Sequence, residues 1–288
     1  WSSDVCSSDL FIAKKITSCN VIPCDITNIE SLRDLFREIK PNIVIHAAAT
    51  KFVDLSEKFP METIDVNVLG SQNVARVSIE NEVEIVLGIS TDKATPPIRN
   101  IYGLTKAIME RNFCLLDGKT KTKFANVRYG NVAWSTGSVL PIWKNMFEET
   151  NIIKSTGPEM RRFFFTVDDA VNLVITAIQN INLIHGKILS REMKSCKMKD
   201  ILDVWVNNFG GSWEHIDGRP GERDDEYLVG ETELEYCDVV YFDNIKHFII
   251  SPNNKVKSPL SNIYHSGNCE KLTSDEILTI INSEKDNV

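Results

Sequence analysis

The sequence predicts an α/β protein built on a doubly wound parallel sheet, followed by a smaller C-terminal lobe. From Asn20 to Val132, short apolar runs alternate with amphipathic stretches, the pattern of repeated strand–helix–strand units. The apolar runs are nearly continuous, as expected of strands that are covered on both faces. After Asn131 the pattern changes to loops and short elements, which indicates a separate lobe.

The individual elements follow from these patterns. We expect strands at 20–25, 42–49, 84–90 and 123–132. We expect helices at 29–40, 60–80, 101–116 and 167–180. Thr27 or Asn28 can cap the first helix.

Composition narrows the class of protein. The 288 residues carry a net charge of −8, which argues against a nucleic-acid partner, because phosphates require a basic surface. No apolar run approaches the ~20 residues of a membrane span, so we expect no membrane segment in this chain. The seven cysteines are scattered without CxxC or metal-ligand spacing, as in a cytoplasmic protein.

The first ten residues, WSSDVCSSDL, show neither helical nor strand periodicity. They resemble the conceptual translation of a common sequencing-library adapter. We therefore expect residues 1–10 to be a non-native leader, with the native sequence starting near Phe11, inside a gene.

Tyr102 and Lys106 lie four residues apart in the predicted helix 101–116, so their side chains share one face. A free tyrosine has a pKa near ~10 and is a poor base at neutral pH. A neighbouring ammonium favours the phenolate, which would let Tyr102 accept a hydroxyl proton during hydride transfer. The YxxxK pattern is common by chance, but here it follows Ser90-Thr91 at a strand end, where a hydroxyl can bond the same substrate oxygen.

Asp92 and Lys93 come next, at the carboxyl end of the predicted strand 84–90. Ligands of open α/β sheets bind at the carboxyl ends of strands. A carboxylic acid beside an amine can serve as general acid and general base in an elimination. The alternative is a solvated loop with an incidental ion pair.

Small side chains end the predicted strand 42–49, in the run His46-Ala47-Ala48-Ala49. They suit either a tightly packed helix or the close approach of a dinucleotide. Asp25, also at a strand end, could accept a hydrogen bond from an adenine amino group or cap the next helix.

Arginines occur in three loops of the second half, and arginine forks bind diphosphate oxygens bidentately. They are Arg128, the pair Arg161-Arg162, and Arg219. Each could equally be an ordinary surface arginine. The five histidines match no ligand spacing, so we expect no metal site.

Together these segments resemble a known family. HAAATK, STDKA, YGLTK, RYGNV, RRFFFT and RPGER occur here in the order seen in UDP-N-acetylglucosamine 4,6-dehydratases of bacterial polysaccharide and pseudaminic-acid pathways. These enzymes belong to the extended short-chain dehydrogenase/reductase family. The resemblance runs from about Asn20 to the segment LTSDEILTII near the C-terminus.

The resemblance implies catalytic roles for the strand-end residues. Tyr102 would take the C4 hydroxyl proton while hydride leaves C4, and Lys106 would hold the cofactor ribose. Thr91 and Ser90 would contact the sugar near O4.

The same resemblance implies an elimination, in which Lys93 removes the C5 proton and Asp92 protonates the departing C6 hydroxyl. Hydride then returns to C6, so NADP, or alternatively NAD, is recycled. The implied cofactor-binding residues are Asp25, Ile26, Ala47, Ala48, Tyr102, Lys106 and Val132. The implied UDP-sugar contacts are Lys51, Ser90, Asn131, Thr136, Gly137, Ser138, Val139, Arg162, Arg219 and Glu222.

One motif of the family is absent, because the chain contains no GxGxxG or GxxGxxG turn. In a Rossmann-type sheet of order 3-2-1-4-5-6, segment 20–24 would be strand 3 and segment 42–46 strand 4. We therefore expect a Rossmann-type sheet without its first two strands, with the adenine–diphosphate half of the cofactor groove open.

This interpretation divides the chain into three parts. After the leader, residues 11–190 would form a truncated dinucleotide-binding domain and residues 191–288 a substrate-binding lobe, to which loop 133–165 contributes. The full-length protein would be a homo-oligomer.

Two other functions fit some of the same residues. A UDP-sugar epimerase would keep Tyr102 and Lys106 but would not need Asp92 and Lys93. A non-catalytic dehydrogenase-fold binding protein would need none of the four.

Overall fold

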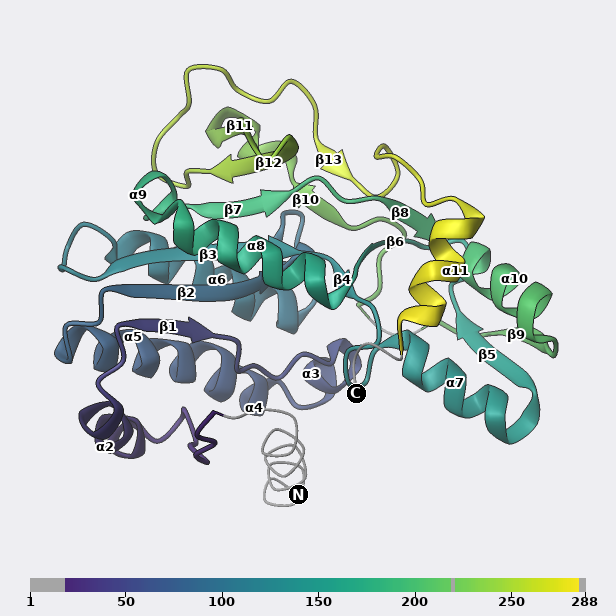
Figure 1. Cartoon of the computed structure of the whole chain (residues 1–288), viewed down its shortest axis with the longest axis horizontal. Helices are drawn as coiled ribbons and strands as arrows, with labels where there is room; N and C mark the ends of the chain where they lie inside the picture. The colour runs from purple at the N-terminus through teal and green to yellow at the C-terminus, as the bar shows by residue number, and fades with distance from the viewer. Residues whose placement is uncertain (1–18, 219–220, 285–288) are drawn as a thin grey trace.

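The computed structural model describes residues 19–218 and 221–284, so the expected leader at 1–10 lies outside the described residues. A sheet of six strands forms the body (Figure 1). Its order is β1 (Ile43–His46), β2 (Ile85–Thr91), β3 (Lys123–Tyr129), β7 (Ile188–Arg191), β12 (Ile245–Ile250) and β11 (Cys237–Phe242). The first four strands run parallel, and the last two are antiparallel additions.

Helices cover both faces of this sheet because alternate side chains of its central strands point to opposite sides. Ile85 and Leu87 of β2 pack with α8 (Val167–Gln179) and α9 (Ile181–Ile184). Val86, between them, lies in a second cluster with side chains of α2 (Ile29–Ile39), α5 (Ser71–Glu80) and α6 (Ile101–Leu116). The predicted doubly wound α/β class is confirmed.

Most predicted helices form as expected. Asn28 caps α2 by accepting hydrogen bonds from the backbone N–H groups of Glu30 and Ser31. α6 has the predicted bounds. The predicted helix 60–80 consists of α4 (Pro60–Ile64), a π-helical segment η1 (Asp65–Gly70) and α5, joined end to end.

The prediction of a strand at 20–25 is wrong, since these residues form no strand. A strand needs a hydrogen-bonding neighbour, and β1 pairs only with β2 among the described residues. The two residues that follow the segment, Ile26 and Thr27, instead lie against η1 and α5. The Asn73 side chain donates to the carbonyls of Ile26 and Thr27, both at 3.0 Å, and the Ile26 side chain packs on Gly70.

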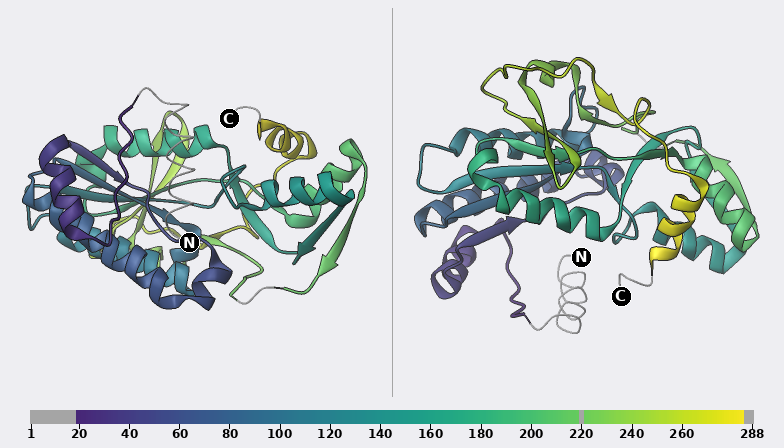
Figure 2. Two further views of the ribbon diagram at one scale, coloured as in Figure 1. Left: turned by 90° about the horizontal axis from the view of Figure 1, so that it is seen from below. Right: turned by 45° about the horizontal axis from the view of Figure 1, so that its top comes forward.

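A smaller lobe lies beside the carboxyl ends of the parallel strands (Figure 2). Trp143, Leu202, Trp205 and Ile277 belong to its separate apolar core. Its elements are α7 (Val139–Thr150), β5 (Ile152–Thr156), α10 (Met198–Phe209), β9 (Ser212–Ile216) and α11 (Ser274–Asn282). The later strands β11 and β12 extend the main sheet instead, although both lie within 191–288.

Short elements complete the structure. They are α3 (Val53–Lys58), the turn η2 (Asp92–Ala94), β4 (Asn131–Val132), β6 (Arg161–Phe165), β8 (Ser195–Lys197), β10 (Tyr227–Val229), η3 (Glu231–Tyr236) and β13 (Tyr264–His265). Across 19–218 and 221–284, no helix is both long and apolar enough to cross a membrane.

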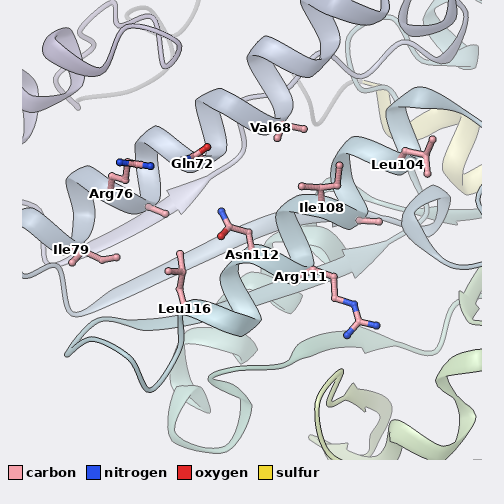
Figure 3. A pocket seen from close by; sticks show the side chains of 11 residues that line it. Val68, Gln72, Arg76, Ile79, Leu104, Ile108, Arg111, Asn112 and Leu116 are labelled. Atoms are coloured by element: carbon pink, nitrogen blue, oxygen red, sulfur yellow. The ribbon is translucent and has the colours of Figure 1, made fainter.

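A groove of about 770 Å³ lies between the outer faces of α5 and α6. Figure 3 shows Gln72 and Arg76 on one side of it and Leu104 and Ile108 on the other. Leu104 and Ile108 are about half exposed (46% and 51%).

The expected homo-oligomer stays a prediction.

Candidate active site

A cleft of about 500 Å³ lies between the carboxyl ends of β2 and β3 and the smaller lobe. Residues from the lobe, such as Trp143 of α7 and Ser155 of β5, line its far side. It contains most of the predicted site residues. They are Ala47, Lys51, Ser90, Thr91, Lys93, Tyr102, Lys106, Asn131, Val132, Gly137, Ser138, Val139, Arg162 and Glu222.

Five predicted residues are not among those that line the cleft. Asp92 is fully buried beside it, and Thr136 is exposed next to Gly137. Asp25, Ile26 and Ala48 also lie outside its lining. The predicted substrate contact at position 219 lies outside the described residues.

The turn η2 and the first turn of α6 lie against each other at the end of β2. The Asn100 side chain caps α6 by accepting a hydrogen bond from the backbone N–H of Gly103 at 2.7 Å. A Cβ at position 103 would collide with the backbone carbonyl of Lys93. The glycine of the YGLTK segment therefore allows the helix that carries Tyr102 to approach the turn that carries Asp92 and Lys93.

Asp92 and Lys93 form an ion pair at the centre of the site. Lys93 Nζ lies 3.0 Å from Asp92 Oδ1, which also accepts a hydrogen bond from Thr91 Oγ1 at 2.9 Å. Two further oxygens surround the same nitrogen, Asn131 Oδ1 and Glu226 Oε1, each at 3.4 Å. The other carboxyl oxygen of Asp92, Oδ2, is buried and has no hydrogen-bond partner among the described residues.

The charges in this cluster set the protonation of the pair. Burial raises the pKa of Asp92 and the negative charge of Glu226 adds to this, against the lowering effect of Lys93. Burial disfavours the Lys93 ammonium, but Asp92 and Glu226 outweigh it, so the pKa of Lys93 is raised. Without ligand, Lys93 is therefore an ammonium, and Asp92 is a carboxyl group with an increased tendency to hold a proton.

Tyr102 lies at the start of α6, and the environment of its hydroxyl differs from the sequence expectation. Burial raises the pKa of Tyr102, and the cation that opposes this rise is Lys93. Lys106 is buried, and its Nζ contacts Met109 Sδ at 3.5 Å within the same helix. Burial lowers the pKa of Lys106 to about 8. The expectation that Lys106 lowers the pKa of Tyr102 is therefore wrong: the opposing cation is Lys93, and burial outweighs it.

Two serine hydroxyls of the cleft are buried without a hydrogen-bond partner within the described part of the chain. Ser90 lies at the end of β2, and Ser138 is the N-cap of α7, where its side chain makes no capping bond. Gly137, just before it, has φ +70°. A buried hydroxyl without a partner is costly, so both positions suit a polar ligand in the cleft.

The predicted arginines divide into two groups. All five N–H donors of Arg128 are used within the protein, by the carboxylates of Glu110 and Glu233 and the carbonyl of Leu228. Arg161 pairs bidentately with Asp225. These two arginines are structural.

Arg162 differs because it lines the cleft. Its guanidinium donates to the backbone carbonyl of Arg161 at 2.9 Å and contacts Met160 Sδ at 2.9 Å. It acts electrostatically on both Lys93 and Glu226. It is therefore a cation at the border between the Asp92–Lys93 cluster and the lobe.

The expected cofactor residues lie in two places. Ala47 and Val132 line the cleft close to Tyr102 and Lys106, which leaves an apolar wall beside a buried amine. Asp25 is exposed, and its carboxylate accepts hydrogen bonds from the N–H and hydroxyl of Thr27, both at 2.8 Å. Asp25 therefore stabilises a turn in this structure.

Sequence reasoning missed Glu226 and Arg223. Both are almost fully buried (3% and 4% exposed), and Arg223 Nη2 lies 2.6 Å from Glu226 Oε2. The signal available was the charged run ERDDE at 222–226, but such runs in loops are usually solvated. Glu226 is far from Lys93 in the sequence, so the contact between their side chains could not be predicted from it.

Known proteins resemble this chain in sequence and in fold. The family described as Polysaccharide biosynthesis protein matches residues 7–246. The chain is 33% identical to an uncharacterized membrane protein of Methanocaldococcus jannaschii, in an alignment that covers 96% of this chain and 86% of that protein. It is 34% identical to a UDP-N-acetylglucosamine 4,6-dehydratase (inverting) of Campylobacter jejuni, over 90% of this chain and 80% of the relative.

Among solved structures, Pen from Bacillus thuringiensis superposes with a TM-score of 0.85 at 27% identity, over 97% of this chain and 87% of Pen. The family match spans most of the sequence, and the relatives align over nearly all of it. A UDP-glucose 4-epimerase of Rickettsia rickettsii is 32% identical over 89% of this chain and 78% of that protein. The chain therefore belongs to the polysaccharide biosynthesis protein family and is a relative of nucleotide-sugar dehydratases and epimerases.

Proposed function

We propose that this protein is a UDP-N-acetylglucosamine 4,6-dehydratase that uses NADP, or alternatively NAD. The observation that carries the proposal is the Asp92–Lys93 pair, buried beside Tyr102 at the end of β2. Similarity to the Campylobacter jejuni enzyme supports the substrate. A sugar epimerase that keeps Tyr102 and Lys106 has no use for a paired acid and base at this place.

The inner part of the cleft fits a nicotinamide riboside. Ala47 and Val132 give a flat apolar wall, Lys106 gives a buried amine for ribose hydroxyls, and Ser90 has an unused hydroxyl. When bound, the nicotinamide would accept hydride from C4 and return it to C6. Because the Asp25 carboxylate is hydrogen-bonded to Thr27, we assign it no contact with the adenine of the cofactor.

Tyr102 and Thr91 act on the sugar hydroxyl at C4. The Tyr102 hydroxyl lies among Lys93, Asp92 and Thr91. Because its pKa is raised, removal of the C4 proton is assisted by the positive charge of Lys93, which favours the phenolate. Thr91 would then hold O4 through its hydroxyl.

Lys93 and Asp92 act on C5 and C6. An ammonium is no base, but a proton passed over the 3.0 Å between Lys93 Nζ and Asp92 Oδ1 gives an amine and a carboxylic acid. The amine would take the C5 proton, made acidic by the C4 ketone. The acid would give its proton to the departing C6 hydroxyl, which leaves as water. The raised pKa of Asp92 favours this acid form, whereas the raised pKa of Lys93 favours the ammonium.

The outer part of the cleft fits a nucleoside diphosphate. The N-terminus of α7, a helix of 12 residues, opens on the cleft at Ser138 and Val139, and helix N-termini attract anions. Arg162 and Lys51 add positive charge to the same cleft. These groups would hold the diphosphate while β5 and β9 of the lobe shape the outer wall.

The test is to incubate the full chain with nicotinamide cofactor and UDP-N-acetylglucosamine in deuterated water and to follow the sugar by NMR. We expect a 4-keto-6-deoxy product with no net reduction of cofactor. A chain that forms no keto product and incorporates no deuterium at C5 is not a dehydratase, and interconversion at C4 alone would indicate an epimerase.

Variants separate the steps. Lys93→Ala and Asp92→Asn should lower product formation about 10²–10⁴-fold while the initial reduction of cofactor in a single turnover falls less. Tyr102→Phe should suppress both signals. Lys121→Ala, a change at an exposed lysine that pairs with Glu82, is the matched control. Equal loss of both signals in the Lys93 variant would contradict the division of roles.

A further inference from the structure

Glu226 is held firmly by its own surroundings. Its backbone N–H donates to Ser266 Oγ at 3.0 Å, and its carbonyl accepts from the Ser266 N–H at 2.8 Å. Its side chain is 3% exposed and enters the cleft from the segment before β10. A carboxylate this deeply buried requires charged partners.

Arg223 supplies one of these partners and ties the segment to the catalytic turn. Its Nη2 lies 2.6 Å from Glu226 Oε2, and its Nη1 donates to the carbonyl of Pro97 at 2.9 Å. A longer contact of 3.4 Å joins Nη2 to the carbonyl of Asp92. The segment 221–226 is therefore fastened to the loop that carries Asp92 and Lys93.

Lys93 is the second partner. An ammonium has three N–H donors, and three oxygens surround Lys93 Nζ, from Asp92, Asn131 and Glu226. Asp92 is adjacent in sequence and Asn131 follows β3, whereas Glu226 comes from a distant segment. We propose that Glu226 is a positioning residue, which fixes the Lys93 side chain at the end of β2 and maintains the charge balance of the Asp92–Lys93 pair. Its catalytic consequence rests on the proposed elimination.

The charged groups that face this cluster come from several elements. They are Asp92, Lys93 and Tyr102 near the end of β2, Arg162 on β6, and Arg223. Removing the negative charge of Glu226 makes proton loss easier from both Asp92 and Lys93, because each then faces less negative charge. Both limbs of a pH–rate profile should therefore move to lower pH.

The first measurement is independent of catalysis. Trace acetic anhydride labels the neutral form of Lys93, and peptide mass spectrometry across a pH series yields its pKa in the full chain. We expect Glu226→Gln to lower the pKa of Lys93 by about one unit or more. Glu226→Asp, which keeps the charge, should retain most of the native value. Glu235→Gln, a change at an exposed glutamate paired with Lys255, is the control.

The second measurement is the pH dependence of kcat/KM for 4-keto product formation. Glu226→Gln should lower kcat about 10–100-fold at the native optimum, less than loss of Lys93 itself, and should shift the profile to lower pH. A purely structural glutamate would lower the rate without moving the profile. An unchanged Lys93 pKa in Glu226→Gln overturns the inference. If the native chain forms no keto product, the proposed function fails, while the labelling result still decides the role of Glu226.

Discussion

Arg128 links three parts of the protein through a buried ion cluster. Its guanidinium lies between the carboxylates of Glu110 on α6 and Glu233 on η3 and also donates to the carbonyl of Leu228. The five hydrogen bonds measure 2.7 to 3.0 Å. The side chains of Arg128, Glu110 and Glu233 are 1%, 4% and 13% exposed. Replacement by methionine fills a similar volume but leaves two carboxylates buried without a cation.

The expected cost follows from that burial. Removing one partner of a buried ion pair typically costs about 3–5 kcal/mol, so Arg128→Met should lower the free energy of unfolding by about this amount. Urea unfolding followed by circular dichroism measures it. Arg33→Met is the matched control, since Arg33 also bridges two carboxylates, Glu30 and Glu80, but on the surface.

The difference in stability loss between the two variants tests whether burial makes the Arg128 cluster important. Because solvent screens the surface pairs, Arg33→Met should change stability far less than Arg128→Met. A loss below about 1 kcal/mol for Arg128→Met, or equal losses for both variants, would refute the view that burial makes this cluster essential.

Two further predictions concern stability. Burial lowers the pKa of His46 from 6.5 to about 3, so the unfolded chain binds the proton first and stability is lost as pH falls below 6.5. His46→Asn should remove up to about 1.4 kcal/mol per pH unit of this dependence in urea unfolding between about pH 6 and pH 4, whereas exposed His215→Asn should not. Gly130→Ala places a Cβ 2.5 Å from Phe163 Cβ and should cost about 1–3 kcal/mol and most of the activity. Gly218→Ala, where a Cβ meets open space, should do neither.

Periodicity was enough to predict the regular body of the fold. The apolar runs that form β2 and β3 are buried between helices, so local pattern and tertiary environment agree there, whereas Ile43 and Ile45 of the edge strand β1 are 42% and 50% exposed. The segment 20–25 has a similar apolar pattern but no neighbouring strand to pair with, and a strand cannot form from its own residues alone. The strands of the lobe depend on contacts between distant segments, as in the pairing of β5 with β9.

The candidate site also combines residues that the sequence predicts with residues that it does not. Ser90, Thr91, Lys93, Tyr102 and Lys106 were predictable because strand-end position and helical spacing bring them into one cleft. Their buried counter-charges were not, since nothing local distinguishes a buried glutamate from a solvated one.

The difference at Tyr102 has a specific structural cause. Helical spacing alone suggests that Lys106, one turn further along α6, is the cation that tunes the phenol. The absence of a side chain at Gly103 lets the first turn of α6 rest on the backbone of Lys93, so the amine from the preceding turn takes that place. One cation, Lys93, therefore acts on both the tyrosine that would begin the reaction and the aspartate that would complete the elimination. Oxidation at C4 would use the ammonium form of Lys93 and the elimination its amine form, so both proposed steps depend on the residue at which the two motifs meet at the end of β2.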